Sequence, residues 1–377
     1  MHRETFILMR DGNFDTDNHR CLLKSVHWWK NISKMKKYNK ALVIGKFQPL
    51  HKGHLTLINF ATTQAKSVTV CVTGHNSEII PLDKRILWAV ETFENKDYVD
   101  VHGLSYNPTQ LNESSVSDVD SSIQWAEYLK ANLEGFSSID VIIGSEIYVK
   151  YMADYLGIGY LIYDEHRVNL PISATDIKND ILRYWDYLTP AVKRSYVQHI
   201  CICGSECTGK STVCNRLGEE LDFVTVIPEI GRCLVGKSAL CGIDSLEKIF
   251  SIHNELLVAV KYDPPTPIIL WDTDNITTLS YLTFLNTSNN NLIAQVVGER
   301  KVVLADKYFF FESNINFYDD GTRFDQSQAK MLSEHHKYMY SRHGIIPEQI
   351  SADNRCEVIR DYILQKIEKL KTTFRPK

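Results

Sequence analysis

Two glycine-containing signatures, each between an apolar run and a helix pattern, constrain this chain more than any other feature. The first is Gly-Lys-Phe-Gln-Pro-Leu-His-Lys-Gly-His at residues 45–54, and the second is Gly-Ser-Glu-Cys-Thr-Gly-Lys-Ser at residues 204–211. The apolar runs are typical of buried parallel strands, so each signature occupies a strand-to-helix turn. Such turns bind phosphate groups, because a helix N-terminus offers free N–H donors. Two different ones in one chain indicate two successive steps on one metabolite.

Composition and charge limit the class of protein. With 377 residues the chain suits two domains, and 44% hydrophobic and 23% charged residues are typical of a soluble globular protein. A net charge of −4 predicts no nucleic-acid partner, and the lack of an apolar run of ~18 residues predicts no membrane segment. Nine cysteines without disulfide or zinc spacing suit a reducing compartment, so we expect a cytoplasmic protein.

The N-terminal segment, residues 1–38, is polar and lacks a clear hydrophobic period. Met35 is a candidate native start, which makes the preceding residues an extension. One alternative is a small helical appendage that docks on the first domain. Another is a DNA-binding helix-turn-helix, although the segment has no basic recognition helix.

Strand and helix patterns alternate along the rest of the chain, which predicts parallel sheets with helices on both faces. Pro190 stops a helix, so we divide the chain into domains at 39–190 and 191–377. Strands are expected at 41–44, 67–73, 98–104, 140–143, 160–163, 197–203, 225–228 and 268–272, with further candidates at 302–305 and 308–311. Helices are expected at 55–65, 83–93, 122–133, 148–156, 210–221 and 245–260. The fold class is therefore α/β.

The His-Lys-Gly-His end of the first signature suits chemistry on the α-phosphate of ATP. Gly53 lets the backbone approach the nucleotide closely, and the helix N-terminus favours phosphate charge. The imidazoles of His51 and His54 can donate hydrogen bonds to a pentacoordinate transition state and to the pyrophosphate that leaves it. The alternative is a turn that carries two surface histidines.

The second signature is a Walker A loop, or P-loop. Its amides cradle the phosphates of ATP, Lys210 bridges the β- and γ-phosphates, and Ser211 is a ligand of Mg²⁺. The residues predicted to bind the nucleotide here are Gly204, Glu206, Thr208, Gly209, Ser211 and Thr212.

Acidic residues after the next two strands indicate a small-molecule kinase. Glu229 or Asp272 can accept the proton of the acceptor hydroxyl, and Asp272 can hold Mg²⁺. Far downstream, Asp-Asp-Gly-Thr-Arg at residues 319–323 suits a lid whose Arg323 closes over the γ-phosphate. An ordinary turn is the alternative for this stretch.

The first half of the chain resembles nucleotidyltransferases of the His-x-Gly-His class, and specifically the nicotinamide-mononucleotide adenylyltransferases. Ile-Ser-Ala-Thr-Asp-Ile-Lys at 172–178 is similar to a second motif of that class, with Lys178 where the family has arginine. Lysine keeps the charge but loses the bidentate fork. Trp125 resembles the family's aromatic residue that stacks on nicotinamide, with a core tryptophan as the alternative. The resemblance also implies catalytic Lys46 and binding residues Gly45, Phe47, Gly144, Ser145, Ser173 and Thr175.

The second half resembles the kinase half of bifunctional NadR-type enzymes, which join an adenylyltransferase to a ribosylnicotinamide kinase in this order. The similar segments are 229–232, 271–278 and 318–323, and the resemblance covers residues 39–365. It adds Arg232 and Asp274 to the expected substrate-binding residues. It implies a Rossmann-like nucleotidyltransferase fold followed by a P-loop kinase fold.

The resemblance implies salvage of NAD. The second domain would phosphorylate nicotinamide riboside with ATP and Mg²⁺, and the first would transfer the adenylyl group of ATP to nicotinamide mononucleotide. The expected partners are these two compounds and NAD, and a homo-oligomer is compatible with the sequence. The alternatives are a nucleotidyltransferase of another acceptor fused to a deoxynucleoside-like kinase, and an ATP-sensing regulatory protein.

Overall fold

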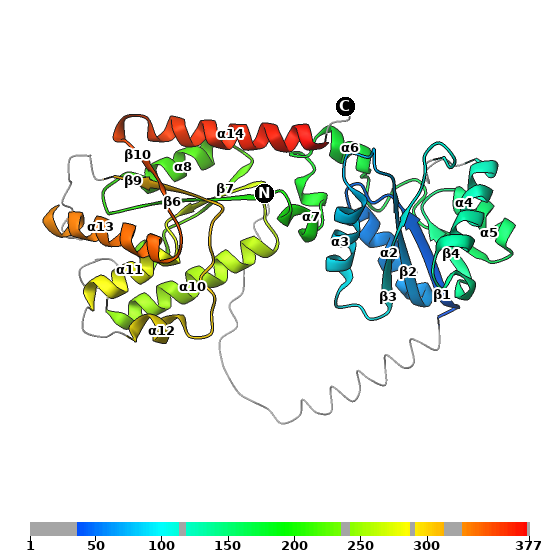
Figure 1. The fold of residues 1–377 in the computed structure, drawn as a ribbon, viewed down its shortest axis with the longest axis horizontal. Coiled ribbons are helices and arrows are strands. Elements are labelled where there is room, and N and C mark those ends of the chain that lie inside the picture. The colour runs from blue at the N-terminus through cyan, green and yellow to red at the C-terminus, as the bar shows by residue number, and fades with distance from the viewer. Residues whose placement is uncertain (1–35, 113–117, 235–241, 287–290, 313–325, 375–377) are drawn as a thin grey trace, which may run out of the picture.

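The computed structural model describes residues 36–112, 118–234, 242–286, 291–312 and 326–374. Within these residues the chain forms two five-stranded sheets in which every pair of neighbouring strands is parallel. Figure 1 shows the two sheets as separate units, the first on the right and the second on the left. Met35, most of the predicted N-terminal extension and the predicted lid residue Arg323 lie outside the described residues.

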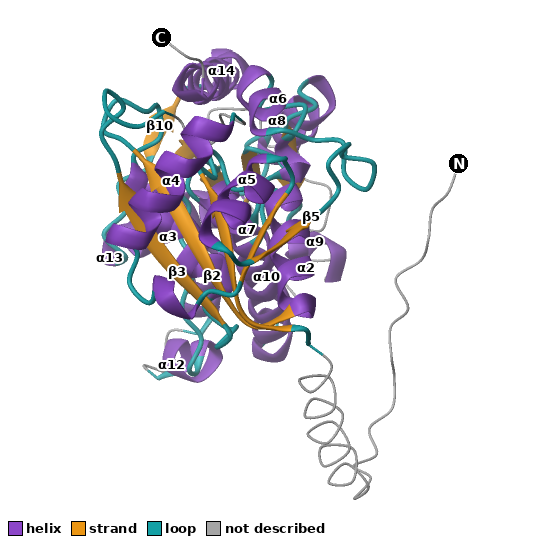
Figure 2. Cartoon of the chain, turned by 90° about the vertical axis from the view of Figure 1, so that its right-hand side faces the viewer, coloured by secondary structure: helices purple, strands orange, loops and turns teal. Residues whose placement is uncertain are grey.

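The first sheet has the strand order β3-β2-β1-β4-β5. Its strands are β1 (Tyr38–Gly45), β2 (Ala65–Gly74), β3 (Val99–Ser105), β4 (Val141–Gly144) and β5 (Gly159–Ile162). The chain moves outward from β1 to β3 and then crosses back to β4. Figure 2 shows the strands in orange, with β2, β3 and β5 of this sheet labelled. A topological switch point therefore lies between β1 and β4, and open α/β sheets bind ligands at the carboxyl ends of strands at such a point.

Helices cover both faces of this sheet because side chains of a strand alternate between its faces. Ala41 and Val43 of β1 pack in one cluster with residues of α2 and α3, whereas Leu42 and Ile44 pack in another with residues of α4 and α5. The helices are α2 (Lys52–Gln64), α3 (Leu82–Phe93), α4 (Val119–Asn132), α5 (Tyr148–Leu156) and α6 (Ala174–Asn179), with a 3₁₀ helix at Phe136–Ser138.

The second sheet has the order β10-β9-β6-β8-β7. Its strands are β6 (Gln198–Gly204), β7 (Val224–Ile227), β8 (Ile268–Asp272), β9 (Lys307–Phe311) and β10 (Glu348–Ile350). The central strand β6 leads into the P-loop, and β8 pairs directly with it, so that Ile202 lies opposite Asp272. This pairing brings the acidic end of β8 beside the loop.

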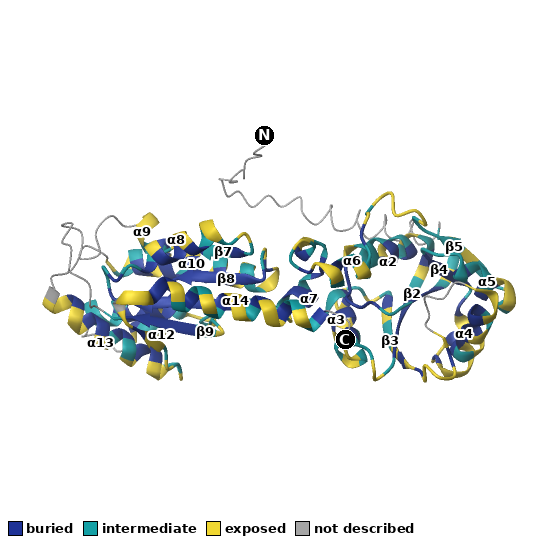
Figure 3. Cartoon of the chain, turned by 90° about the horizontal axis from the view of Figure 1, so that it is seen from above, coloured by how far each residue is buried: buried dark blue, intermediate teal, exposed yellow. Residues whose placement is uncertain are grey.

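Helices also cover both faces of the second sheet, with α8 and α14 on one side and α10 to α13 on the other (Figure 1). The strands β8 and β9 are buried throughout apart from Lys307 at the start of β9, as the dark blue ribbon in Figure 3 shows. The helices are α8 (Lys210–Glu220), α9 (Ile230–Leu234), α10 (Ile243–Tyr262), α11 (Asn275–Leu285), α12 (Leu292–Val297), α13 (Gln326–Arg342) and α14 (Arg355–Phe374), with a 3₁₀ helix at Ala352–Asn354.

A short connector joins the two units and contacts both of them. It contains a 3₁₀ helix (Trp185–Tyr187) and α7 (Pro190–Arg194), which lies between the sheets in Figures 1 and 3. Trp88 of α3 donates a hydrogen bond to Ser195 Oγ (2.7 Å), and Lys193 Nζ pairs with Asp263 Oδ1 after α10 (2.8 Å). The domain boundary that we predict at residues 190/191 falls at the start of α7.

The predicted fold class is confirmed, because both halves form parallel sheets flanked by helices. The candidate strand at 302–305 is wrong, whereas the one at 308–311 is β9. The reason is pairing: β9 finds β6 on one side and β10 on the other, and 302–305 has no neighbouring strand among the described residues. None of the helices in the described part of the chain is long and apolar enough to cross a membrane.

Gly204→Ala should destabilise the second sheet. Gly204 has a φ of +132°, and a Cβ there would lie 2.4 Å from the carbonyl oxygen of Phe311 on the paired strand β9. We expect a loss of at least about 2 kcal/mol in the free energy of unfolding, measured by urea denaturation. Gly231→Ala is the matched control, because its nearest neighbour would be Ile249 Cδ1 at 3.7 Å. Equal stability of the two variants would contradict the prediction.

Candidate functional sites

A cavity of about 560 Å³ opens at the carboxyl ends of the strands of the first sheet. It includes residues that follow β1 and β4, so it lies at the switch point. It also brings the first signature together with the segment 172–178, which is more than a hundred residues away in sequence. The predicted site residues that line it are Gly45, Lys46, Phe47, His51, Gly53, His54, Ser145, Ser173, Thr175 and Lys178.

The two histidines are held by the start of α2. His51 is the N-cap residue, and its Nδ1 accepts a hydrogen bond from Gly53 N (3.1 Å). His54 Nδ1 accepts from His51 N (3.3 Å), and the two ring centroids lie 3.7 Å apart. Because Nδ1 is an acceptor in both rings, a neutral imidazole must carry its proton on Nε2. Each ring therefore offers an N–H donor from Nε2.

Burial keeps both imidazoles neutral. Desolvation, with the nearby positive charge of Arg167, lowers the pKa of His51 to about 4. Desolvation also holds the pKa of His54 well below its usual range, and the charges of His51 and Arg167 act in the same direction. Positive charge in the cavity therefore comes from lysine and arginine side chains, while the histidines supply neutral donors.

Three cationic side chains line this cavity. Two were predicted, Lys46 and Lys178, and the third is Arg167, which sequence reasoning missed. Arg167 belongs to a turn after β5 in which its N–H donates to Asp164 O (2.8 Å). The sequence offers no motif for it, since a single arginine in a polar loop resembles many surface residues.

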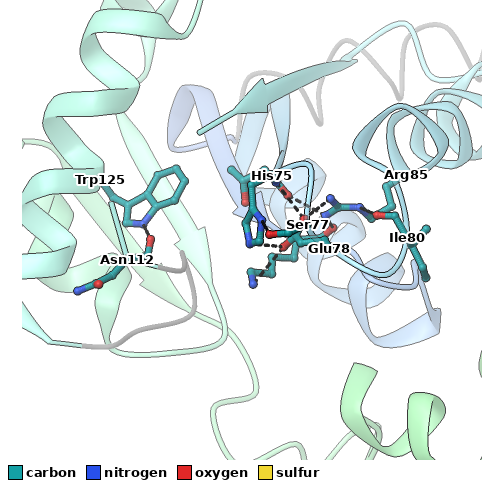
Figure 4. Close-up of polar contacts among 9 residues, drawn as sticks. His75, Ser77, Glu78, Ile80, Arg85, Asn112 and Trp125 are labelled. Carbon is teal, nitrogen blue, oxygen red and sulfur yellow. Dashed lines mark hydrogen bonds and ion pairs between the residues drawn. The ribbon is translucent and has the colours of Figure 1, made fainter. Parts of the chain in front are cut away.

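Trp125 lies away from the cavity lining. It is 2% exposed, its Nε1 donates to Asn112 O (2.9 Å), and its ring meets the edge of Tyr106 at 5.0 Å. Figure 4 shows Trp125 and Asn112 apart from the group around His75. These contacts are those of a tryptophan packed in the interior. They do not test stacking on a nicotinamide ring, which stays a prediction. Gly144 likewise precedes the cavity lining and packs under Tyr148 and Val149.

The P-loop has a backbone that few residues adopt. Gly204 and Gly209 have φ of +132° and +81°, and Cys207 has a φ of +59°. The side chain of Lys210 turns back across the loop, where its Nζ donates to Ser205 O (2.8 Å). Thr208 Oγ1 donates to the same carbonyl oxygen (2.9 Å). Positive φ values within one tight loop turn several backbone N–H groups toward one point, which makes an anion-binding nest.

Two carboxylates approach the P-loop from neighbouring strands. Asp272, at the end of β8, accepts a hydrogen bond from Ser211, and Lys210 and Glu229 act on its charge. Burial raises the pKa of Asp272 above its usual range, and Lys210 and Ser211 oppose this rise. Glu229 follows β7 and pairs with Arg232 Nη2 at 2.9 Å. The predicted acids and Arg232 thus belong to one region of the structure.

Asp274 has a structural contact that the sequence did not indicate. It is fully buried and caps α11, because its Oδ1 accepts hydrogen bonds from Thr277 N (2.9 Å) and from Tyr340 OH (2.7 Å). It therefore joins α11 to α13. A role in binding substrate stays a prediction.

Arg355 is a second residue that sequence reasoning missed. It begins α14, is 4% exposed and donates hydrogen bonds to Thr208 O in the P-loop and to Glu312 O. Its guanidinium also lies 4.7 Å above the ring of Phe311. Because a peptide's carbonyl and N–H point in opposite directions, holding Thr208 O outward turns the N–H of Gly209 into the loop. Glu206, also predicted here, accepts from Tyr281 OH (3.0 Å).

The donor set beside the P-loop suits magnesium better than a transition metal. Asp272 Oδ1 is buried and has no hydrogen-bond partner among the described residues, and Ser211 adds a hydroxyl oxygen. Mg²⁺ uses one or two protein oxygens together with phosphate and water. Within the described residues, no group of three or more His, Cys, Asp or Glu side chains has the arrangement of a metal site.

Comparison with known proteins agrees with this division into two sites. The family model for cytidylyltransferase-like proteins matches residues 42–100, which include the first signature. The model for AAA domains matches residues 199–355, which include the P-loop. Fold and motifs thus define a protein with a nucleotidyltransferase-like domain followed by a P-loop domain.

Two curated relatives are similar along most of the chain. The trifunctional NAD biosynthesis/regulator protein NadR of Salmonella typhimurium is 25% identical over 307 residues, which are 76% of this chain and 72% of the relative. The protein of the same name from Escherichia coli is 25% identical over 303 residues, 75% of this chain and 71% of the relative. A crystal structure of NadR protein in complex with NR has 20% identity and a TM-score of 0.47, and the match covers 85% of this chain and 91% of that chain. The resemblance to the NadR-type proteins is confirmed by the sequence matches.

The lowered histidine pKa values predict that the protein loses stability in mild acid. Between about pH 6.5 and pH 4 the unfolded chain binds a proton at His51 and the folded chain does not. The free energy of unfolding should therefore fall as the pH falls through this window, by up to about 3 kcal/mol for this group. The buried His253, with a pKa lowered to about 4, acts in the same direction.

Urea denaturation between about pH 7 and pH 4.5 measures this slope. His51→Gln should reduce it, whereas the same change at the exposed His166 should leave it as in the wild type. A slope that is unchanged in His51→Gln would show that the imidazole takes up its proton equally in both states.

Proposed function

We propose that this protein makes NAD in two ATP-dependent steps. The second domain would phosphorylate nicotinamide riboside, and the first would join the resulting mononucleotide to the adenylyl group of ATP. The observation that carries the proposal is that one chain contains both sites. The NadR relative of Salmonella typhimurium aligns with this chain over 307 residues, so the two proteins share the order of the sites. Both relatives are NAD biosynthesis proteins, which supports the choice of substrates.

In the kinase step, each group around the P-loop would have a separate role. Lys210 and the loop amides would hold the β- and γ-phosphates, and Ser211 and Asp272 would hold Mg²⁺, which when bound offsets the charge of the transferring phosphoryl group. Asp272 already accepts a hydrogen bond from Ser211, with which it would hold the metal, so we assign the base to Glu229, which follows the neighbouring strand β7. Glu229 would accept the proton of the 5′-hydroxyl of the riboside.

In the adenylyl step, the phosphate of the mononucleotide would attack the α-phosphate of ATP and displace pyrophosphate. His51 and His54 would donate from Nε2 to oxygens of the pentacoordinate phosphorus. Lys46, Lys178 and Arg167 would hold the charge of the triphosphate, since all three line the same cavity. Neutral donors suit this task, because they stabilise developing charge without releasing a proton.

Two variants separate the steps. His54→Ala should convert nicotinamide riboside to the mononucleotide and form NAD at a rate at least about a hundredfold lower than the wild type. Lys210→Ala should form NAD from supplied mononucleotide but leave the riboside unchanged, because the P-loop lysine is essential for phosphoryl transfer. Chromatography of riboside, mononucleotide and NAD measures both outcomes.

Mixing the two variants provides the control for misfolding. The mixture should form NAD from the riboside, since the mononucleotide made by one variant diffuses to the intact site of the other. If the wild type forms neither mononucleotide nor NAD from the riboside, ATP and Mg²⁺, the proposal is wrong. Turnover of a deoxynucleoside or of another nucleotidyl acceptor in its place would favour the alternative pair of activities.

Arg355→Met should weaken ATP binding in the kinase step. Without the guanidinium, Thr208 O loses its donor and the loop amides lose their orientation. We expect the KM for ATP of the kinase step to rise about tenfold and the adenylyl step to stay unchanged, as measured by steady-state kinetics of each step. Arg360→Met is the matched control, because this arginine lies on the same helix and pairs with Glu220 at the surface. A KM that stays at the wild-type value would count against this role for Arg355.

A further inference from the structure

A buried ion pair lies beside the cavity of the first site, between Glu78 and Arg85. Arg85 of α3 is fully buried, the side chain of Glu78 is 4% exposed, and Arg85 Nη2 donates directly to Glu78 Oε2. Figure 4 shows the two side chains turned toward each other, with His75 and Ser77 alongside. Neither residue belongs to a sequence signature that we identified.

The guanidinium of Arg85 binds three backbone carbonyls. Its Nε donates to Ile80 O (3.0 Å), and its Nη1 donates to Thr73 O (2.8 Å) and to Lys46 O (2.6 Å). Thr73 lies near the end of β2, Lys46 directly follows β1, and Ile80 precedes α3. One side chain therefore fixes the backbone at which Lys46 enters the cavity.

The carboxylate of Glu78 reaches the side chain of Lys46 itself. Glu78 Oε1 lies 3.1 Å from Lys46 Nζ, while Oε2 accepts from His75 N (3.1 Å). Glu78 Oε1 accepts no hydrogen bond from the described residues, so its contact with Lys46 is an ion pair. Lys46 and Glu78 both line the cavity. The carboxylate thus sets the direction of the ammonium group, and Arg85 in turn holds the carboxylate.

The backbone at Gly74 lies so close to the ion pair that a side chain there would collide with it. A Cβ at Gly74 would lie 2.0 Å from Arg85 Nη2 and 2.6 Å from Glu78 Oε2. A buried ion pair adds little net stability, because desolvation offsets most of the attraction, and an apolar pair of similar volume would stabilise the fold as well. Stability alone therefore does not account for a charged pair at this place.

We propose that Glu78 and Arg85 are positioning residues that hold Lys46 in the geometry for adenylyl transfer, an inference that rests on the proposed function. Lys46 and Arg85 carry two positive charges and Glu78 one negative charge, so the group offers one net positive charge to a triphosphate. Glu78 keeps the ammonium group close to the end of β1, in the cavity that also contains His51 and His54.

Glu78→Gln tests this role by removing the charge and keeping the shape. We expect kcat of the adenylyl step to fall about tenfold or more, because Lys46 loses the charge that orients it. The KM for ATP should not rise, since the cavity loses a negative charge and binds the triphosphate at least as well. Arg85→Lys should give a similar loss of kcat, because lysine cannot reach all three carbonyls at once.

A double-mutant cycle distinguishes positioning from general support of the fold. If Glu78 acts through Lys46, then Glu78→Gln in a Lys46→Ala background should reduce kcat by less than about twofold. If the full reduction persists in that background, Glu78 acts independently of Lys46 and the proposal is wrong.

Kinase turnover of the same preparations reports whether the chain is folded. It should be unchanged in Glu78→Gln, and Glu94→Gln, an exposed change at the end of α3, should leave both steps unchanged. Equal loss of both activities in Glu78→Gln, or a kcat of the adenylyl step within about twofold of the wild type, would overturn the positioning role. A wild type that makes no NAD from the mononucleotide would instead refute the proposed function, so the two failures are distinguishable.

Discussion

Both sites depend on one constraint: a buried strand must turn into a helix within a few residues and leave backbone donors for phosphate. A helix start has N–H groups without intrahelical partners, and these must find an acceptor. The first site meets this need partly with imidazoles, since His51 Nδ1 caps Gly53 N. The second site leaves the amides to the ligand and shapes them with positive φ at Gly204, Cys207 and Gly209. The two turns thus solve the same problem with different chemistry.

Charge is balanced differently in the two sites. In the first, burial makes His51 and His54 neutral, while Glu78 pairs with the ammonium group of Lys46 and Arg85 binds the backbone carbonyl of Lys46. In the second, Lys210 donates a hydrogen bond to a carbonyl oxygen of the loop, and burial raises the pKa of the Asp272 carboxyl group. The second site therefore favours the binding of a polyphosphate together with a cation. The polyphosphate would interact with the ammonium group of Lys210, and the cation would interact with the carboxylate of Asp272.

The sequence predicted the elements well, since apolar runs and helical periods are local signals. It placed 268–272 as a buried strand, and β8 has these bounds. It offered 302–305 as a strand and was wrong, because a strand forms only where a neighbouring edge accepts its hydrogen bonds. It marked Trp125 as a stacking residue or a core residue, and the contacts with Asn112 and Tyr106 describe a packed one. No local sequence pattern marked Glu78, Arg85, Arg167 or Arg355. Each of these residues contacts a distant segment of the chain or lines a cavity together with one.

By itself the sequence determined the class of chemistry, since the identity and spacing of His51, Gly53, His54, Gly209 and Lys210 belong to single turns of the chain. Only the tertiary structure decided which residues support those turns. Arg85 reaches Lys46 across 39 positions and Arg355 reaches Thr208 across 147. Such pairs depend on strand order and helix packing, which place the carboxyl ends of parallel strands at one edge. A local sequence pattern cannot predict which residues meet at that edge, because the edge forms only when the whole sheet has assembled.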